Sequence, residues 1–429
     1  MRILLKNADI VTVNEDNEVL KGYDIITLDN KIKTIIQSSS LSLQGEFDEV
    51  MDCTNKIVMP GLINCHTHTP MTLLRNYADD LNLQEWLFNN ILPIEANMTK
   101  EMCYKGSRLA TLEMIKTGTT TFNDMYFYAE ESLKAGLDSG LRTVVCGAKE
   151  LNYDYESIKK LITRYQKNQQ IRFMSYIHAI YTFNKEKIKS AIKLAHEFDL
   201  PIHMHISETK KEVDDCFKEN GVTPVRYLEN IGLFERPVVA AHCVHLTEED
   251  IEIFKRHNVN VVHNPASNMK LASGIAPITK MIDKGVNVCL GTDGAGSNNN
   301  LDMFKELRLA SYLQKVSTYD PTAFNVDTAL KVATVNGAKA LGIENLGQIK
   351  EGYKADLIII DASKTYYYPK TNIKSQIVYS GNAEDVETVI INGRIVMKNK
   401  EMLTMDEEKV KYEAQKAYEE LKKGGNING

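Results

Sequence analysis

Short apolar runs alternate with longer amphipathic segments through the middle of the chain. Eight such runs occur, at residues 57–65, 119–124, 142–147, 173–180, 201–206, 238–244, 259–263 and 286–291. Most are separated by segments with helical periodicity, for example 97–116, 130–139 and 185–197, and 302–316 follows the last run. Near-continuous apolar strands separated by helices are typical of a parallel sheet covered on both faces. Eight units over residues 57–350 predict an α/β fold with a closed, TIM-like (β/α)8 barrel, and a doubly wound open sheet is the alternative.

The two ends of the chain have a different pattern, rich in β-branched residues and short turns. Strands are expected over 2–13, 19–28 and 31–36, and again over 355–361, 375–379 and 386–397, where Asn392-Gly393 signals a hairpin. We therefore predict one small β-sandwich built from both ends, with parts at 1–56 and 351–405 around a barrel at 57–350. Residues 406–429 form a C-terminal helix and tail, with the helix over 406–423.

Composition narrows the possible partners. The 429 residues carry a net charge of −6, with 43% hydrophobic and 25% charged residues, as in ordinary globular proteins. No basic block indicates nucleic acid, and no apolar stretch approaches the roughly 20 residues of a membrane span. The N-terminus lacks the apolar core of a signal peptide, and the seven cysteines are scattered without a CxxC pair. We expect a cytoplasmic protein with a small-molecule substrate; homo-oligomer formation stays open.

Polar residues of one chemical kind recur where the predicted strands end. The first strand ends with His66 and His68, which point to the same side of an extended chain. Further candidates follow on the fifth, sixth and eighth strands: His203, His205, Glu208, His242 and Asp293. The active site of a (β/α)8 barrel lies at this edge, so these side chains should meet.

Three neutral imidazoles and a carboxylate suit one divalent metal ion, most simply Zn²⁺, with Fe²⁺ as the alternative. A lone histidine at a strand end is usually only a hydrogen-bonded polar residue. A set of five histidines and one aspartate on four strand ends instead favours a metal site. The pattern leaves His203 and His205 open as the fifth-strand ligand, because both lie on one face of the strand.

The chain resembles the amidohydrolase superfamily, and within it the 5-methylthioadenosine/S-adenosylhomocysteine deaminases. The string PGLINCHTH at 60–68 is the superfamily's first-strand signature. The strings MTLLRNYADDL at 71–81 and HNPASNMKLASG at 263–274 resemble the deaminase and chlorohydrolase branch. The likeness extends over residues 1–400 and implies the same barrel fold.

The resemblance also assigns roles. It implies that His66, His68, His205 and Asp293 hold the metal, that Glu208 shuttles protons and that His242 is a partner of the attacking water. It further implies that Glu95 binds the ribose hydroxyls and that His178 contacts the nucleoside. The fourth strand has no lysine of the kind that bridges two metals in other superfamily members, which argues for one metal.

The expected reaction is hydrolytic deamination of an adenine nucleoside to its inosine analogue plus ammonia through a metal-bound hydroxide. The nucleoside would be 5′-methylthioadenosine, adenosine or S-adenosylhomocysteine. Asp293 would accept the proton of water, and Glu208, if burial raises its pKa, would protonate the ring. The alternatives are a guanine or pterin deaminase, a triazine chlorohydrolase, or a barrel-derived assembly protein, which should have lost the ligands. The cytidine-type zinc deaminases are excluded because their Pro-Cys-x-x-Cys motif is missing.

Two departures from the family concern the far end of the substrate. Members that accept the homocysteine tail place arginines after the third strand, where this chain offers only Lys149 as a nearby cation. The usual Pro-His-x-Pro-Tyr around the fourth-strand histidine reads IHAIY at 177–181. Both departures favour methylthioadenosine or adenosine over S-adenosylhomocysteine.

Overall fold

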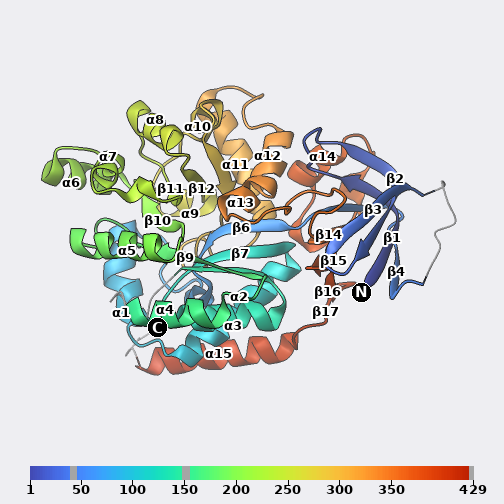
Figure 1. Ribbon diagram of the computed structural model, residues 1–429, viewed down its shortest axis with the longest axis horizontal. Helices are drawn as coiled ribbons and strands as arrows, with labels where there is room; N and C mark the ends of the chain where they lie inside the picture. The colour runs from blue at the N-terminus through green and yellow to red at the C-terminus, as the bar shows by residue number, and fades with distance from the viewer. Residues whose placement is uncertain (39–45, 147–154, 425–429) are drawn as a thin grey trace.

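The computed structural model describes residues 1–38, 46–146 and 155–424, and they form two sheets (Figure 1). One is an eight-stranded parallel sheet in which the strands follow each other in chain order. Its strands are β6 (Leu62–Thr67), β7 (Thr119–Met125), β8 (Arg142–Cys146), β9 (Ile171–Tyr176), β10 (Ile202–Ile206), β11 (Val238–His242), β12 (Asn260–His263) and β13 (Asn287–Leu290).

The first and last strands of this sheet meet and close it into a barrel. Just beyond β13, the Asp293 amide donates to the His66 carbonyl at 2.9 Å. The Thr292 amide donates to the side-chain oxygen of Asn64, in β6, at 3.0 Å. The predicted (β/α)8 barrel is therefore confirmed, and the open doubly wound sheet is excluded.

Helices of different lengths connect the barrel strands and cover the outside of the barrel (Figure 1). The longer ones are α2 (Lys100–Lys116), α3 (Ala129–Ser139), α4 (Tyr155–Tyr165), α5 (Lys185–Glu197), α6 (Lys210–Asn220), α8 (Glu248–Arg256) and α11 (Met303–Thr318). The shorter ones are η1 (Thr69–Leu74), η2 (Glu85–Ile91), α1 (Leu92–Glu95), α7 (Pro224–Asn230), η3 (Leu233–Glu235), α9 (Pro265–Lys270), α10 (Ile278–Asp283), α12 (Val326–Val332) and α13 (Val335–Ala340).

The second sheet is built from both ends of the chain, as predicted. Nine strands form one mixed sheet in the order β17-β16-β15-β14-β5-β1-β2-β3, with β4 paired to β1. The strands are β1 (Arg2–Val11), β2 (Val19–Leu28), β3 (Lys31–Gln37), β4 (Glu49–Asp52), β5 (Lys56–Pro60), β14 (Leu357–Asp361), β15 (Val386–Ile391), β16 (Arg394–Lys398) and β17 (Glu401–Met402). Hydrogen bonds between β5 and β14 join the two ends of the chain.

Alternation along β14 explains how this sheet packs. Leu357 and Ile359 belong to a core that lies within the end sheet. Ile358 and Ile360 point to the other face and join the barrel's core. Successive side chains of a strand point to opposite faces, so one apolar strand supplies both cores. The fold class is thus confirmed, while the domain boundaries at 1–56, 57–350, 351–405 and 406–429 stay a prediction.

The apolar run 57–65 is two strands, where one was expected. Its first half is β5 of the end sheet and its second half is β6 of the barrel, with Gly61 between them. A side chain at Gly61 would place its Cβ 2.1 Å from the side chain of Thr120, so only glycine fits where the chain passes from one sheet to the other. The hydrophobic pattern cannot reveal this break because both halves are buried.

The strand expected over 375–379 is wrong. These residues lie in the helical turns α14 (Ile373–Ser375) and η5 (Gln376–Ser380), which follow η4 (Thr365–Tyr367) and precede η6 (Ala383–Asp385). The Asn372 side chain caps the first turn by accepting from the Ser375 amide. The predicted hairpin at Asn392-Gly393 is confirmed, with both residues at positive φ between β15 and β16.

The C-terminal helix α15 (Glu407–Gly424) runs along the barrel beside α2 (Figure 1). Its buried side chains are Val410, Ala414, Ala417 and Leu421, spaced three or four residues apart on one face. This agrees with the helix predicted over 406–423. Across the described part of the chain, none of the helices combines the length and the apolar character needed to cross a membrane.

A buried ion pair joins the barrel to the end sheet. Arg142, at the start of β8, donates from Nε to Asp356 at 2.6 Å and from Nη2 to the other carboxylate oxygen at 3.1 Å. The Asn392 side chain accepts from the same guanidinium at 2.8 Å. Both charged side chains are almost inaccessible to solvent, at 2% and 0% exposed. The pair therefore ties β8 to the start of β14, and Asn392 links the same guanidinium to the turn between β15 and β16.

Candidate metal centre and active site

Four side chains from the first, fifth and eighth barrel strands converge at one edge of the barrel. His66, His68, His205 and Asp293 each offer one ligand atom, and these atoms all lie within 4.8 Å of one another. The Nε2 atoms of His66 and His205 are 3.1 Å apart. Asp293 Oδ1 lies 3.3 Å from His66 Nε2 and 3.2 Å from His68 Nε2. This set matches the donors that Zn²⁺ takes in proteins, so the four side chains can hold a metal ion.

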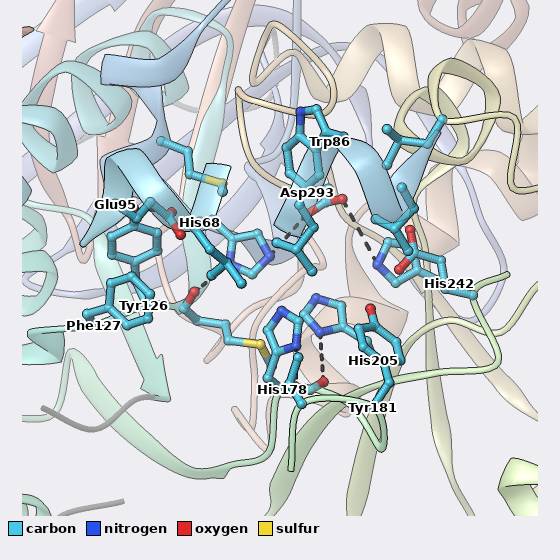
Figure 2. A pocket seen from close by; sticks show the side chains of 18 of the residues that line it. His68, Trp86, Glu95, Tyr126, Phe127, His178, Tyr181, His205, His242 and Asp293 are labelled. Atoms are coloured by element: carbon cyan, nitrogen blue, oxygen red, sulfur yellow. Dashed lines mark hydrogen bonds and ion pairs between the residues drawn. The ribbon is translucent and has the colours of Figure 1, made fainter. Parts of the chain in front are cut away.

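Hydrogen bonds at the back of two of the rings orient them toward this centre. The carbonyl of Met125 accepts from Nδ1 of His68, and the carbonyl of His178 accepts from Nδ1 of His205 at 2.8 Å (Figure 2). A carbonyl only accepts, so each ring carries a proton on Nδ1, which leaves Nε2 as the atom that can bind a metal.

Of the two fifth-strand candidates, only His205 reaches the cluster with a ring nitrogen. His203 also points into the barrel, but its Nε2 lies 2.8 Å from Nδ1 of His66, behind that ring. The resemblance pointed to His205, while the strand pattern left the two open. Alternation cannot separate them because they differ in depth within the barrel, which only the tertiary structure determines.

Burial and the carboxylate control the charges in the cluster. Burial lowers the pKa of His66 to about 4 and that of His205 well below its usual value. Burial also acts to lower the pKa of His68, but Asp293 outweighs it, and the pKa rises to about 9. Burial alone would raise the pKa of Asp293, whereas His66 and His68 hold it well below its usual value. The site thus provides an ionised carboxylate that favours a positive charge beside it.

Glu208 and His242 line the same pocket as Asp293. Figure 2 shows His242 beside Asp293, on the side away from His68. Glu208 Oε1 is 3.7 Å from His242 Nδ1, and His242 Nε2 is 4.0 Å from Asp293 Oδ2. Burial raises the pKa of Glu208, which His242 lowers and Asp293 raises further. A carboxyl whose pKa is raised and which lies beside a metal-binding cluster is suited to donate a proton.

The polar residues that hold these groups were not found from the sequence. Ser267 and Ser297 donate to Asp293 Oδ2 at 2.7 and 2.9 Å, and Asn268 Oδ1 lies 2.9 Å from His242 Nδ1. The Glu212 carboxylate accepts from the amide of Glu208 at 2.8 Å. Ser267 and Asn268 lie in the string at 263–274, which carried the family resemblance, and that string was the available signal.

Three of the strand ends that carry site residues adopt left-handed backbone conformations. Ser207 has φ 52°, His242 φ 71° and Asp293 φ 63°. Such residues cost roughly 1–3 kcal/mol each unless the surroundings hold them, and they cluster at functional sites. Here the Glu212 carboxylate holds the turn after β10 by accepting from the Ser207 amide at 3.0 Å.

The pocket in front of the cluster has one polar and one apolar region. Glu95 is buried, and the Tyr126 hydroxyl donates to it. Burial raises the pKa of Glu95 to about 7, although this hydrogen bond acts to lower it. His178 lines the pocket beside His205, with ring centroids 4.7 Å apart. The outer wall is apolar or aromatic and consists of Leu83, Trp86, Leu87, Leu92, Phe127, Tyr181 and Leu271.

Every site residue predicted from the sequence therefore lies in this pocket or directly behind it. Among the described residues that line the pocket there is no lysine or arginine. Lys149, the one cation expected near the far end of the substrate, lies outside the described residues.

Comparison with known proteins agrees with the fold and identifies the family. Residues 57–396 match the model of the amidohydrolase family, so the chain belongs to this family. Within it, the chain is 45% identical over 420 residues to a 5-methylthioadenosine/S-adenosylhomocysteine deaminase of Acetivibrio thermocellus, covering 96% of this chain and 97% of the relative. It is 46% identical over 428 residues to a 5′-deoxyadenosine deaminase of Methanosarcina barkeri, covering 98% of both chains.

Solved structures show the same architecture. A crystal structure of an adenosine deaminase from Xanthomonas campestris with bound zinc superposes with a TM-score of 0.94 at 32% identity, covering 98% of both chains. An atrazine chlorohydrolase from Arthrobacter aurescens superposes with a TM-score of 0.89 over 97% of this chain, but at 22% identity this likeness shows the fold alone.

Proposed function

We propose that this enzyme removes the 6-amino group of an adenine nucleoside by hydrolysis and releases ammonia and the inosine analogue. The observation that carries the proposal is a buried, protonatable Glu208 in the same pocket as the cluster of His66, His68, His205 and Asp293. The deaminase names of relatives at 45% and 46% identity support it. Displacing chloride from a triazine needs no acid for the leaving group, so Glu208 favours deamination over chlorohydrolase activity.

The metal is one divalent ion per subunit, held by His66, His68, His205 and Asp293, and we propose zinc, with Fe²⁺ as the alternative. Zinc takes nitrogen and oxygen ligands of this kind, and the Xanthomonas deaminase carries it. When bound, the ion would lower the pKa of a water molecule enough to supply a nucleophile near neutral pH.

The protein's own groups move the protons. Asp293 is ionised and accepts a proton from the attacking water, whose oxygen forms a bond to C6 of the purine. Glu208 donates its proton to N1, which gains electron density as the ring is attacked. Asp293 then passes this proton to the amino group, so that ammonia leaves as the C6–N bond breaks. The hydroxyl group now on C6 returns a proton to Glu208 as the carbonyl of the product forms, and both carboxyl groups regain their starting states. His242 lies between the two carboxyl groups and orients the water.

Recognition of the nucleoside depends on the rest of the pocket. Glu95 accepts hydrogen bonds from the ribose hydroxyls, with the Tyr126 hydroxyl holding its carboxylate in place. His178 contacts the nucleoside. Burial lowers the pKa of His178 to about 3, so its ring is neutral and does not compete with the metal for anionic groups.

The apolar outer wall selects the substituent on the ribose 5′ carbon. The described pocket offers no lysine or arginine to a carboxylate, and burying an unpaired carboxylate costs several kcal/mol. We therefore propose that this substituent is a methylthio group, a hydrogen atom or a hydroxyl group, and not an amino-acid tail.

A panel of nucleosides tests both the proposed deaminase activity and the proposed preference for an uncharged 5′ substituent. Adenosine, 5′-methylthioadenosine, 5′-deoxyadenosine and S-adenosylhomocysteine would be incubated with zinc-loaded enzyme while the adenine-to-hypoxanthine absorbance change is followed. We expect kcat/KM for S-adenosylhomocysteine to be lower than for methylthioadenosine by about tenfold or more, equivalent to about 1.4 kcal/mol. 5′-Butylthioadenosine, which has a tail of similar length without charges, is the matched control. No turnover of any nucleoside would refute the deaminase proposal.

A second prediction concerns Glu95 and pH. The pKa of Glu95 is about 7, so its carboxyl is protonated below this pH and ionised above it. An ionised carboxylate accepts hydroxyl hydrogen bonds more strongly, so KM for adenosine should fall as pH rises through about 7. Glu95→Gln should raise KM for adenosine several-fold and remove this pH dependence. 2′,3′-Dideoxyadenosine lacks the ribose hydroxyls, so its KM should change neither with pH nor in Glu95→Gln. A response equal to that of adenosine would contradict the role of Glu95 in binding the hydroxyls.

The cysteines indicate the cellular compartment of the protein. All seven cysteines are free and buried, as suits a reducing compartment, and we propose the cytoplasm. Homo-oligomer formation stays a prediction.

A further inference from the structure

One buried histidine stands behind the metal-binding cluster with no role in the proposed reaction. His203, on β10, is 0% exposed and has a partner on each ring nitrogen. Its Nε2 lies 2.8 Å from Nδ1 of His66, and its Nδ1 lies 2.8 Å from the Val239 carbonyl on the adjacent strand β11. We propose that His203 is a positioning residue that fixes the tautomer and orientation of His66 and thereby raises the affinity of the centre for its metal.

The direction of the hydrogen bonds follows from the Val239 carbonyl. A carbonyl oxygen only accepts, so Nδ1 of His203 carries a hydrogen. The ring is fully buried and forms no ion pair with a carboxylate in the described structure, so a second ring proton would leave an uncompensated buried charge. His203 is therefore neutral, and its Nε2 has only a lone pair.

This lone pair determines the state of His66. Nε2 of His203 must accept, so the hydrogen in the short contact belongs to Nδ1 of His66. The other nitrogen of His66, Nε2, then presents its lone pair to Asp293 and His205, where the metal would bind. The chain of bonds from Val239 through His203 to His66 thus selects the tautomer that can act as a ligand.

The other two histidines of the cluster are held differently. The Nδ1 atoms of His68 and His205 are bonded to backbone carbonyls, which substitution of a side chain does not remove. His66 is held by a side chain instead. Its orientation can therefore be tested by mutation without changing a ligand.

Two variants separate a hydrogen-bonding role from a packing role. His203→Leu fills most of the space but leaves Nδ1 of His66 without an acceptor. His203→Gln places a carbonyl oxygen close to the former position of Nε2 and restores an acceptor. Zinc affinity would be measured for the purified full chain by competition with a chromophoric chelator, with no substrate present. Circular dichroism and thermal unfolding of the metal-free forms would monitor folding.

We expect His203→Leu to weaken zinc binding about 10–100-fold, the usual effect of losing a partner behind a metal ligand. His203→Gln should recover most of the affinity. His263→Leu is the matched control, because His263 is another buried histidine at a barrel strand end, 1% exposed, and neither of its ring nitrogens has a hydrogen-bond partner among the described residues. It should keep zinc affinity within about twofold of the parent.

Three results would overturn the proposal: parental affinity in His203→Leu, equal losses in the Leu and Gln variants, or an equal loss in His263→Leu. The proposal rests on the metal centre of the proposed function, but the two fail differently. A parent protein that binds no zinc refutes the centre itself, whereas a parent that binds zinc with unchanged variants refutes only the role of His203.

Discussion

Replacing Glu208 with Gln should lower kcat for an adenine nucleoside by about 10²–10⁴-fold while leaving the bound metal in place. The amide keeps the size of the side chain but cannot deliver a proton to the ring nitrogen. Glu208 does not belong to the four residues whose ligand atoms lie within 4.8 Å of one another, so the substitution leaves all four metal ligands in place. Turnover would be followed by absorbance, and metal content by elemental analysis of the same sample.

The control for a change of charge is Glu197→Gln, on the exposed surface of α5, which should keep parental kcat. Loss of metal from Glu208→Gln would identify Glu208 as a ligand and contradict its role as the acid. Full activity with metal retained would contradict that role as well.

Replacing Arg142 with Met should lower the free energy of unfolding by about 3–5 kcal/mol, because Asp356 would remain buried without a counter-ion. The backbone amide of Asn392 would still donate to Asp356 at 2.8 Å, but it carries no charge. The measurement is the shift in the urea midpoint of unfolding, followed by circular dichroism.

Two further variants make this result interpretable. Arg142→Met combined with Asp356→Leu removes both charges and should recover a large part of the loss. Lys210→Met breaks the exposed Lys210–Asp214 pair, at 73% and 59% exposed, and should cost less than about 1 kcal/mol. A loss from Arg142→Met as small as that from Lys210→Met would show that the pair contributes little to the joint between the sheets.

The barrel could be predicted because each of its strands is an apolar run bounded by helical periodicity, as at Val238–His242. The site could be predicted because metal ligands are of few residue types and stand at strand ends.

The features that could not be predicted depend on contacts between distant segments of the chain. Gly61 divides one apolar run between two sheets only because Thr120 lies against it. The helical turn at 376–380 has a β-like composition, but the Gln376 side chain donates to the Tyr367 carbonyl at 2.6 Å and holds the chain in place.

Within the site, too, contacts between distant segments decide what the sequence pattern leaves open. His203 and His205 have the same side-chain direction and the same residue type, so only their depth in the barrel decides which one meets Asp293. Ser267, one of the two serines that hold Asp293, comes from a different loop, and no spacing rule connects these two residues.

The seam where the barrel closes brings together ligands that are synthesised at very different times. The bond between Thr292 and Asn64 joins residues 228 positions apart, and the strands on its two sides carry His66, His68 and Asp293. A chain emerging from the ribosome therefore has its first two histidines long before the aspartate exists. Until then the nascent chain has at most the three histidines of the centre without its carboxylate, and the complete set of ligands arises when the last strand docks. A bound ion would therefore link the first barrel strand to the last across this seam.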